Sequence, residues 1–323
     1  MLSRLGIIAA VGALAALALP GLTQKPAWTP APGHPTMDLW PGTPPDASPI
    51  PGPEVDTTGP GNNNLIAGKP LIRLGNVSRP TLTLYAPKGA ASGAAVVVFP
   101  GGGYRILAID LEGTEVCDWL NGIGVACVLV KYRVPGADTK LAGTGPYPSS
   151  KEALDDAQRV VGLARSHAAE WHIDPNRIGV LGFSAGAHLA VALSTHYDKR
   201  LYAPVDAADQ LSCRPDFAVI VYPGYLADVE QSYLDKLDIY PNTQTPTSFI
   251  VQAEDDTVHV ENSTTYFLAL KKAKVPAELH LYAKGGHGYG LRPQANLPVT
   301  TWPTSVEAWL HTIHVLAVAR PQN

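Results

Sequence analysis

The chain has 323 residues, of which 46% are hydrophobic and 16% charged, so it can bury a large core and carries too little charge for a disordered chain. Its formal net charge is −4, and no basic stripe is present to follow a phosphate backbone. We therefore expect no nucleic-acid partner.

Residues 1–23 are predicted to be an export signal. Arg4 gives a positive start, Leu5 to Leu19 form an uncharged apolar run, and Pro20-Gly21 break it. The run is shorter than the roughly 20 residues that span a bilayer, and its flanks fit a signal peptide. An uncleaved membrane anchor is the alternative. We expect a secreted or periplasmic protein with no stable membrane insertion once the signal is removed.

Residues 24–61 are predicted to be a proline-rich arm or linker that precedes the catalytic domain at 62–323. Proline removes backbone donors and blocks helix interiors, so this stretch is not expected to fold as a unit by itself. Trp28 and Trp40 are candidates for docking it onto the domain.

The rest of the chain alternates between strand-like and helix-like segments. The predicted strands are mostly continuous Val/Ile/Leu runs: Thr81–Tyr85, Ala94–Phe99, Val125–Tyr132, Arg177–Gly182, Phe217–Tyr222, Ser248–Ala253 and Ala277–Tyr282. The predicted helices lie between them or follow the last strand: Glu112–Leu120, Lys151–Trp171, Ala185–Thr195, Glu261–Lys272 and Val306–Val318. This order indicates an α/β fold with a mostly parallel, doubly wound sheet. Ligands of such sheets bind at the carboxyl ends of the strands.

Three cysteines are present, Cys117, Cys127 and Cys213, and an odd number cannot all pair within one chain. Export permits one disulfide, but the interpretation favoured by the apolar run around Cys127 is that the cysteines are small buried hydrophobic residues. None has metal-ligand spacing, so we expect no metal.

Pro100-Gly101-Gly102-Gly103-Tyr104 directly follows a predicted strand. Acyl transfer produces an oxyanion, which fixed backbone N–H groups stabilise. Glycines let the backbone approach a substrate oxygen without side chains in the way. An ordinary glycine turn is the alternative.

Gly182-Phe183-Ser184-Ala185-Gly186 stands between a predicted strand and a predicted helix. A strand, a sharp turn with serine at its tip and a helix make up a nucleophile elbow. Ser184 would also lie at the positive end of the helix. The amides of Gly102, Gly103 and Ala185 are the expected oxyanion hole.

Two more loops supply the partners that a serine nucleophile needs. Glu254-Asp255-Asp256 and Gly285-Gly286-His287-Gly288 each follow a predicted strand. A serine hydroxyl requires a base, and the base requires a carboxylate to hold its tautomer. Serine, acid and histidine occur here in the chain order of α/β-hydrolases.

In combination, these motifs resemble those of bacterial α/β-hydrolases known as acetyl esterases, acetylxylan esterases or xylanase-associated esterases. The resemblance covers roughly Leu71 to the C-terminus and rests on FPGGGY, EGTEV, KYR, GFSAG, DDTVHVENS and KGGHG. It implies an α/β-hydrolase fold with a sheet of about eight strands, a lightly lidded site for short acyl groups, and no cofactor. The acid of related enzymes lies just before a stretch like Val258-His259-Val260, which selects Asp255 over Asp256.

The expected activity is a serine carboxylesterase acting on a small-molecule or carbohydrate ester, with Ser184, Asp255 and His287 as the catalytic residues. Tyr104 and Phe183 are expected to contact the substrate. Two alternatives stay open, a serine peptidase of the prolyl-oligopeptidase type and a non-catalytic pseudo-hydrolase that binds a partner. The missing propeller-sized N-terminal region argues against the first, and the complete set of candidate residues argues against the second.

Overall fold

The computed structural model describes residues 27–47, 49–50, 52–59, 65–134, 146–228, 234–235, 239–294 and 296–316, with backbone alone at 146–150, 228 and 234–235. The predicted export signal at 1–23 lies outside these residues. In the described part of the chain, no helix is both long enough and apolar enough to cross a membrane.

Eight strands form the central sheet, in the spatial order β1-β6-β9-β7-β10-β11-β14-β15. In chain order they are β1 (Thr36–Asp38), β6 (Thr81–Tyr85), β7 (Ala95–Phe99), β9 (Ala126–Lys131), β10 (Ile178–Phe183), β11 (Phe217–Val221), β14 (Thr247–Ala253) and β15 (Ala277–Tyr282). Strand β6 is antiparallel to both of its neighbours, and all other neighbours are parallel. Every residue of β7, β10 and β11 is buried, which explains their continuous apolar sequences.

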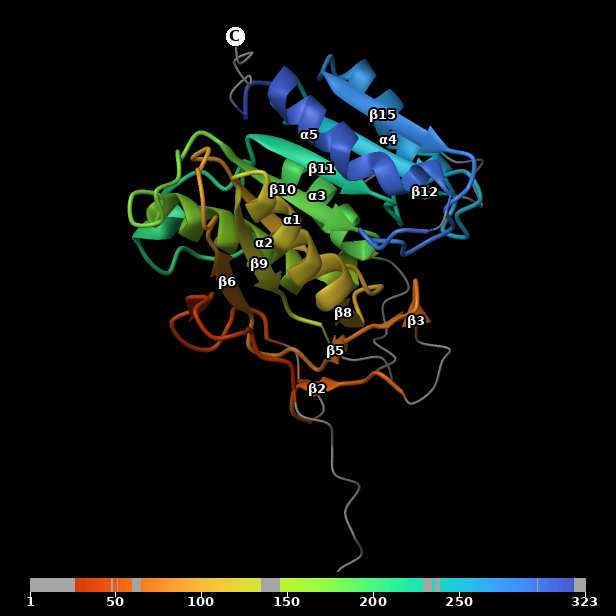
Figure 1. Ribbon diagram of the computed structural model, residues 1–323. Coiled ribbons are helices and arrows are strands. Elements are labelled where there is room, and N and C mark those ends of the chain that lie inside the picture. The colour runs from red at the N-terminus through yellow and green to blue at the C-terminus, as the bar shows by residue number, and fades with distance from the viewer. Residues whose placement is uncertain are drawn as a thin grey trace, which may run out of the picture.

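Helices cover both faces of this sheet (Figure 1). Helices α1 (Glu115–Gly122) and α5 (Trp302–Thr312) lie on one face, where the rings of Trp119 and Trp302 meet edge to face at 5.5 Å. Helices α2 (Pro146–Ser166) and α3 (Ala185–Thr195) pack against each other on the other face. Helix α4 (Glu261–Lys272) connects β14 to β15. The short helices are η2 (Asp110–Thr114, a π-helix), η3 (Ala207–Gln210) and η4 (Pro298–Thr301).

Three small sheets surround the main one. Strands β2 (Val55–Asp56), β5 (Arg73–Gly75) and β8 (Ile106–Ala108) form one of them, and β8 follows the glycine loop at 101–103. The other two are hairpins, β3 (Leu65–Ile66) with β4 (Lys69–Pro70), and β12 (Ala227–Asp228) with β13 (Leu234–Asp235).

The proline-rich arm is bound to the domain along its described length. It contributes β1 to the edge of the main sheet and β2 to a small sheet. Trp40 is buried, and its Nε1 donates to Asp156 Oδ1 at 2.8 Å. The guanidinium of Arg133 reaches Asp156 and also donates to the Pro45 carbonyl oxygen at 2.6 Å. Trp40 thus docks the arm, as the sequence suggested. Together with Arg133, it connects the arm to Asp156 on α2.

The predicted doubly wound α/β sheet is confirmed, and each end of the seven predicted strands lies within one residue of the observed end. The eighth strand, β1, comes from the arm, where its three residues give no apolar run to detect. Three predicted helices are shifted. Helix α2 runs from Pro146 to Ser166 rather than from Lys151 to Trp171, and α5 runs from Trp302 to Thr312 rather than from Val306 to Val318. The segment predicted at Glu112–Leu120 begins as a π-helix at Asp110.

The cysteine interpretation was wrong for two of the three residues. Cys117 on α1 and Cys127 on β9 form a disulfide, and their Cα atoms lie 5.1 Å apart. Both are fully buried, so the apolar surroundings that suggested free thiols surround the disulfide instead. Cys213 is a free, buried cysteine, as expected.

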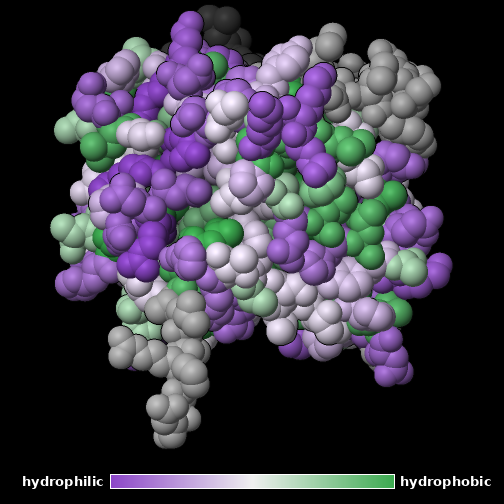
Figure 2. Space-filling view, turned by 90° about the horizontal axis from the view of Figure 1, so that it is seen from above, coloured by the Kyte–Doolittle hydropathy of each residue, from purple (hydrophilic) through white to green (hydrophobic). Residues whose placement is uncertain are grey.

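The end of the molecule that carries α4, α5 and β15 has a mixed surface. Viewed from above, it shows hydrophobic residues gathered in patches between hydrophilic ones (Figure 2). Leu268 on α4 and Leu281 on β15 are exposed, and β15 is the last strand of the sheet on this side.

Candidate active site

Ser184 stands at the tip of the turn between β10 and α3. Its backbone has φ 52° and ψ −118°, a conformation that a residue with a side chain rarely adopts. The turn is possible because glycines flank it. A Cβ on Gly182 would lie 2.0 Å from the Gly186 carbonyl oxygen, and a Cβ on Gly186 would lie 2.1 Å from the Phe99 carbonyl oxygen. The elbow thus presents the Ser184 hydroxyl at the carboxyl edge of the sheet.

Ser184, His287 and Asp256 form a chain of hydrogen bonds. Ser184 Oγ lies 2.9 Å from His287 Nε2, and His287 Nδ1 lies 2.9 Å from Asp256 Oδ2. The Asp256 side chain is fully buried. Its oxygens also accept from the Val258 amide at 2.7 Å and from Gln252 Nε2 at 3.0 Å. These donors hold the carboxylate in place against His287, which is the arrangement that a serine nucleophile requires.

The expectation that Asp255 contacts the histidine was wrong, because Asp256 does so. Consecutive residues in the turn after β14 point in different directions, and Asp255 points to the backbone of the histidine loop. Its Oδ1 accepts from the amides of Gly285 at 2.9 Å and Gly286 at 2.8 Å. These hydrogen bonds, that from Gly286 foremost, lower the pKa of the Asp255 carboxyl. Asp255 therefore anchors the loop that carries His287, and the two aspartates have separate roles.

The glycine loop lies against the nucleophile. A Cβ on Gly101 would lie 2.9 Å from Ser184 Cβ, so only a glycine permits this approach. Gly102 and Gly103 have positive φ angles of 131° and 63°, and neither amide has an acceptor within the described part of the chain. Ala185 is the first residue of α3, so its amide is one of those at the helix N-terminus that have no partner within the helix. That Gly102, Gly103 and Ala185 form an oxyanion hole stays a prediction, and the close approach of the neighbouring Gly101 to Ser184 is compatible with it.

The two residues expected to contact substrate, Phe183 and Tyr104, differ in where their side chains lie. Phe183 is fully buried and packs against Tyr222 and Trp302, so its side chain cannot reach a ligand, and that expectation was wrong. Side chains alternate along β10, and Phe183, the residue before Ser184, points to the face of the sheet that α5 covers. Tyr104 lies at the end of the glycine loop, where its hydroxyl is 2.6 Å from His188 Nδ1 and its ring stacks on Tyr225 at 6.1 Å.

Three residues that sequence reasoning missed support this site. Glu112 is buried and accepts from the Gly101 amide, Tyr222 packs edge to face on His287, and Gln252 holds Asp256. Glu112 belongs to the EGTEV motif, which by itself predicts no role for it. The sequence feature that could have indicated it is an acidic residue next to the apolar Leu111, at the start of a predicted helix. A carboxylate buried at such a position needs hydrogen-bond partners.

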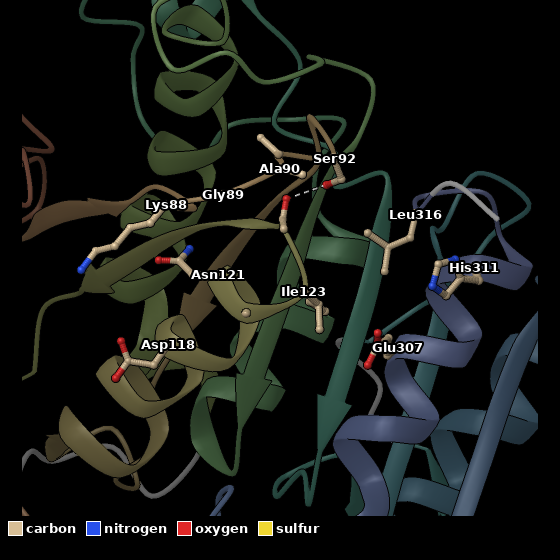
Figure 3. Close-up of a pocket in the computed structure, with 13 residues that line it drawn as sticks. Lys88, Gly89, Ala90, Ser92, Asp118, Asn121, Ile123, Glu307, His311 and Leu316 are labelled. Atoms are coloured by element: carbon tan, nitrogen blue, oxygen red, sulfur yellow. Dashed lines mark hydrogen bonds between the residues drawn. The ribbon is translucent and has the colours of Figure 1, made fainter. Parts of the chain in front are cut away.

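A hollow of about 760 Å³ lies at the opposite edge of the sheet, where β7 and β9 begin (Figure 3). Its polar groups hold loops together. Ser92 Oγ donates to the Gly124 carbonyl oxygen at 2.9 Å, and Asn121 Nδ2 donates to those of Tyr85 and Val125. None of the catalytic candidates lines it. Among the residues that the structure describes, no group of three or more His, Cys, Asp or Glu could hold a metal ion.

Several known proteins that this chain resembles are named esterases. Residues 96–240 match the family model of the α/β-hydrolase fold. An acetylxylan esterase of Xylanibacter ruminicola is 30% identical over 247 residues, which are 69% of this chain and 46% of that protein. The chain thus spans about half the length of this relative.

Two solved structures have a similar fold. An acetyl ester-xyloside bifunctional hydrolase from Caldicellulosiruptor lactoaceticus is 30% identical and superposes with a TM-score of 0.66 over 92% of this chain and 100% of that one. A propionate-bound esterase from Thermogutta terrifontis is 25% identical, with a TM-score of 0.61 over 76% and 93% of the two chains. This chain belongs to the α/β-hydrolase family.

Proposed function

We propose that this protein is a serine carboxylesterase that releases short acyl groups, acetyl first, from carbohydrate alcohols. The observation that carries the proposal is the hydrogen-bonded series from Ser184 through His287 to Asp256. Beside it lie the amides of Gly102 and Gly103, which have no acceptor among the residues that the structure describes. The esterase names of its relatives support the same activity.

In the proposed mechanism, Ser184 attacks the ester carbonyl while His287 Nε2 accepts the hydroxyl proton. Asp256 holds the Nδ1–H tautomer and stabilises the imidazolium that forms. The amides of Gly102, Gly103 and Ala185 stabilise the oxyanion. His287 then protonates the leaving alcohol, and water hydrolyses the acyl-enzyme by the same route.

A carbohydrate alcohol is supported by an exposed aromatic ring at the glycine loop. Tyr225 is 40% exposed, and its hydroxyl lies 3.8 Å from where a Cβ on Gly103 would be. It stacks on Tyr104, which His188 anchors in turn. An exposed ring on a fixed base offers a flat apolar surface to a sugar ring, with a hydroxyl at its edge.

Hydrolysis of acetylated xylo-oligosaccharides and nitrophenyl acetate, measured beside a nitrophenyl peptide, tests this proposal. We expect both esters to be cleaved and the peptide to be left intact. Tyr225→Ala should raise KM for the oligosaccharide several-fold and change nitrophenyl acetate turnover little. Tyr240→Ala, at another exposed tyrosine, is the control and should alter neither. Cleavage of the peptide alone would move the protein to the peptidases.

Short acyl chains are expected because the segment 223–246 between β11 and β14 is charged and tyrosine-bearing rather than a long apolar lid. Extra methylenes add about 0.8 kcal/mol each only where they are buried. The kcat/KM values for nitrophenyl acetate, butyrate, octanoate and decanoate should therefore fall along the series. A steady rise toward decanoate contradicts the short-acyl assignment.

Export from the cytoplasm is part of the proposal. The apolar start of the sequence supports it, and so does the Cys117–Cys127 disulfide, since disulfides persist in oxidising compartments. N-terminal sequencing of protein from the native host should give a start between Leu19 and Lys25. Met1 or Leu2 on cytoplasmic protein would rule export out.

A further inference from the structure

Glu112 is a buried carboxylate behind the active site that the three-residue mechanism does not use. It lies in the π-helix Asp110–Thr114 and is 4% exposed. Interruptions of this kind in a helix occur often at functional sites. An ionisable group buried this deeply is costly unless each of its oxygens has a partner.

Both oxygens of Glu112 accept hydrogen bonds, one from each side of the active site. Oε2 accepts from the Gly101 amide of the glycine loop at 2.7 Å. Oε1 accepts from the Tyr222 hydroxyl at 2.8 Å, and that hydroxyl accepts from the Gly290 amide of the histidine loop at 3.1 Å. One carboxylate thus connects the oxyanion loop to the loop that carries His287.

The hydrogens in this network are accounted for without a proton on Glu112. The Tyr222 hydroxyl accepts from Gly290, so its own hydrogen is directed to Glu112. Burial keeps the pKa of Tyr222 well above its usual range, so the hydroxyl retains that hydrogen. Burial also raises the pKa of Glu112, but the hydrogen bond from Tyr222 and the nearby His287 oppose this rise. The network suits the ionised carboxylate.

The Glu112 carboxylate and His287 are close enough to interact electrostatically. The Tyr222 ring separates Glu112 from the imidazole and meets it edge to face at 4.9 Å. Asp256 is the other carboxylate that bears on His287. The groups that bear on Glu112 itself are Tyr222, Tyr132, Asp110 and His287. A second negative charge near the imidazole favours its protonated form.

We propose that Glu112 is a positioning residue that fixes the glycine and histidine loops relative to each other and, as a second carboxylate near His287, stabilises the imidazolium formed during acyl transfer. This inference rests on the proposed esterase activity. Glu112 touches neither the substrate nor the reacting atoms. It acts through Gly101 on the oxyanion hole and through Tyr222 on the base.

The test is the pH profile of Glu112→Gln, a change that removes the charge and nearly preserves the shape. His287 must be neutral to accept the Ser184 proton, so the acid limb of kcat/KM reports its pKa. With nitrophenyl acetate between pH 5 and pH 9, the limb should move to lower pH by about half a unit or more. The kcat value should fall at least about tenfold because both loops loosen.

Two controls separate charge from structure. Glu115→Gln removes a carboxylate of the adjoining turn that pairs with Arg292 instead, and its acid limb should stay at the wild-type pH. Tyr222→Phe removes the hydroxyl that joins Glu112 to the Gly290 amide, so kcat should fall. A folded Glu112→Gln protein with wild-type kcat and acid limb overturns the inference.

If Glu112→Gln does not fold, by circular dichroism and thermal melting, Glu112→Asp takes its place. It keeps the charge but is too short to reach both donors, so kcat should fall while the acid limb stays. A kcat equal to that of the wild type overturns the positioning role. Failure of the esterase proposal itself is separate, because it would appear as activity retained in Ser184→Ala.

Discussion

At the residue scale, the site depends on which of two adjacent aspartates faces the histidine. The motif placed an acid in the loop after β14, and that placement was right. The resemblance selected Asp255 over Asp256, and that choice was wrong, because the direction of each side chain depends on turn geometry that the motif does not contain. In the structure Asp256 is buried on His287, and Asp255 binds the Gly285 and Gly286 amides.

Exchanging each aspartate for asparagine separates these roles. Asp256→Asn should lower kcat by about 10⁴, because an amide no longer selects the Nδ1–H tautomer of His287. Asp255→Asn keeps an oxygen acceptor for the two glycine amides and should cost far less. The measurement is kcat for nitrophenyl acetate at pH 8, with the melting temperature of each variant. A larger loss in Asp255→Asn would reverse the assignment.

His188 gives the fold a predictable sensitivity to acid. It is fully buried, and burial lowers its pKa to about 3 from an ordinary value of 6.5. Between pH 6.5 and pH 3 the unfolded chain binds a proton that the folded chain excludes. Stability therefore falls as the pH falls through this window, by at most about 1.4 kcal/mol per pH unit.

His188→Asn tests this dependence, since it keeps an acceptor for the Tyr104 hydroxyl but does not titrate. The variant loses some stability at every pH because it is smaller. Its free energy of unfolding in urea should nevertheless decline less steeply than that of the wild type between pH 6.5 and pH 4. Parallel slopes for the two proteins would show that His188 is not the group responsible.

At the element scale, the strand–turn–helix around Ser184 was predictable because local sequence determines it. Continuous apolar runs predicted buried strands, and the glycine spacing predicted the elbow. The π-helix at Asp110 was not predictable, since it depends on Glu112 reaching Gly101 and Tyr222, two residues brought close only by the fold. The three-residue strand β1 was missed for a similar reason, because pairing with β6 defines it.

Gly186→Ala tests the closeness of the elbow to β7. Its new methyl group would lie 2.1 Å from the Phe99 carbonyl oxygen, so the helix must move or the protein must lose stability and activity together. Gly122→Ala in α1 is the matched control, since nothing lies within 4 Å of its added carbon. We expect a large fall in melting temperature and kcat for the first variant only. Equal behaviour of the two would contradict the packing described here.

At the scale of the whole molecule, the arm is part of the domain rather than a spacer. Its composition predicted an extended chain, which it is, but composition does not show what an extended chain binds. Trp40 connects it to Asp156 on α2, and that residue also binds Arg133. The Trp40 ring further meets Tyr202 edge to face at 4.7 Å.

Trp40→Ala should therefore destabilise the protein by about 3–5 kcal/mol, the usual cost of removing a buried large aromatic side chain. Trp40 contacts Asp156 and Tyr202 rather than Ser184, His287 or Asp256. The kcat value measured below the melting temperature should therefore change little. Urea unfolding gives the stability, with Tyr240→Ala at a 62% exposed ring as the control. A stability equal to that of the control would mean that the arm is not anchored through Trp40.

The central claim, that Ser184 is the nucleophile of an esterase, is tested most directly by Ser184→Ala. The fold and the glycine loop remain in this variant, while the atom that forms the acyl-enzyme is gone. With nitrophenyl acetate and a preparation free of other esterases, kcat should fall by a factor on the order of 10⁶, as for the nucleophile of a serine protease, with an unchanged circular dichroism spectrum. A folded Ser184→Ala protein that keeps a large share of wild-type activity would contradict the account.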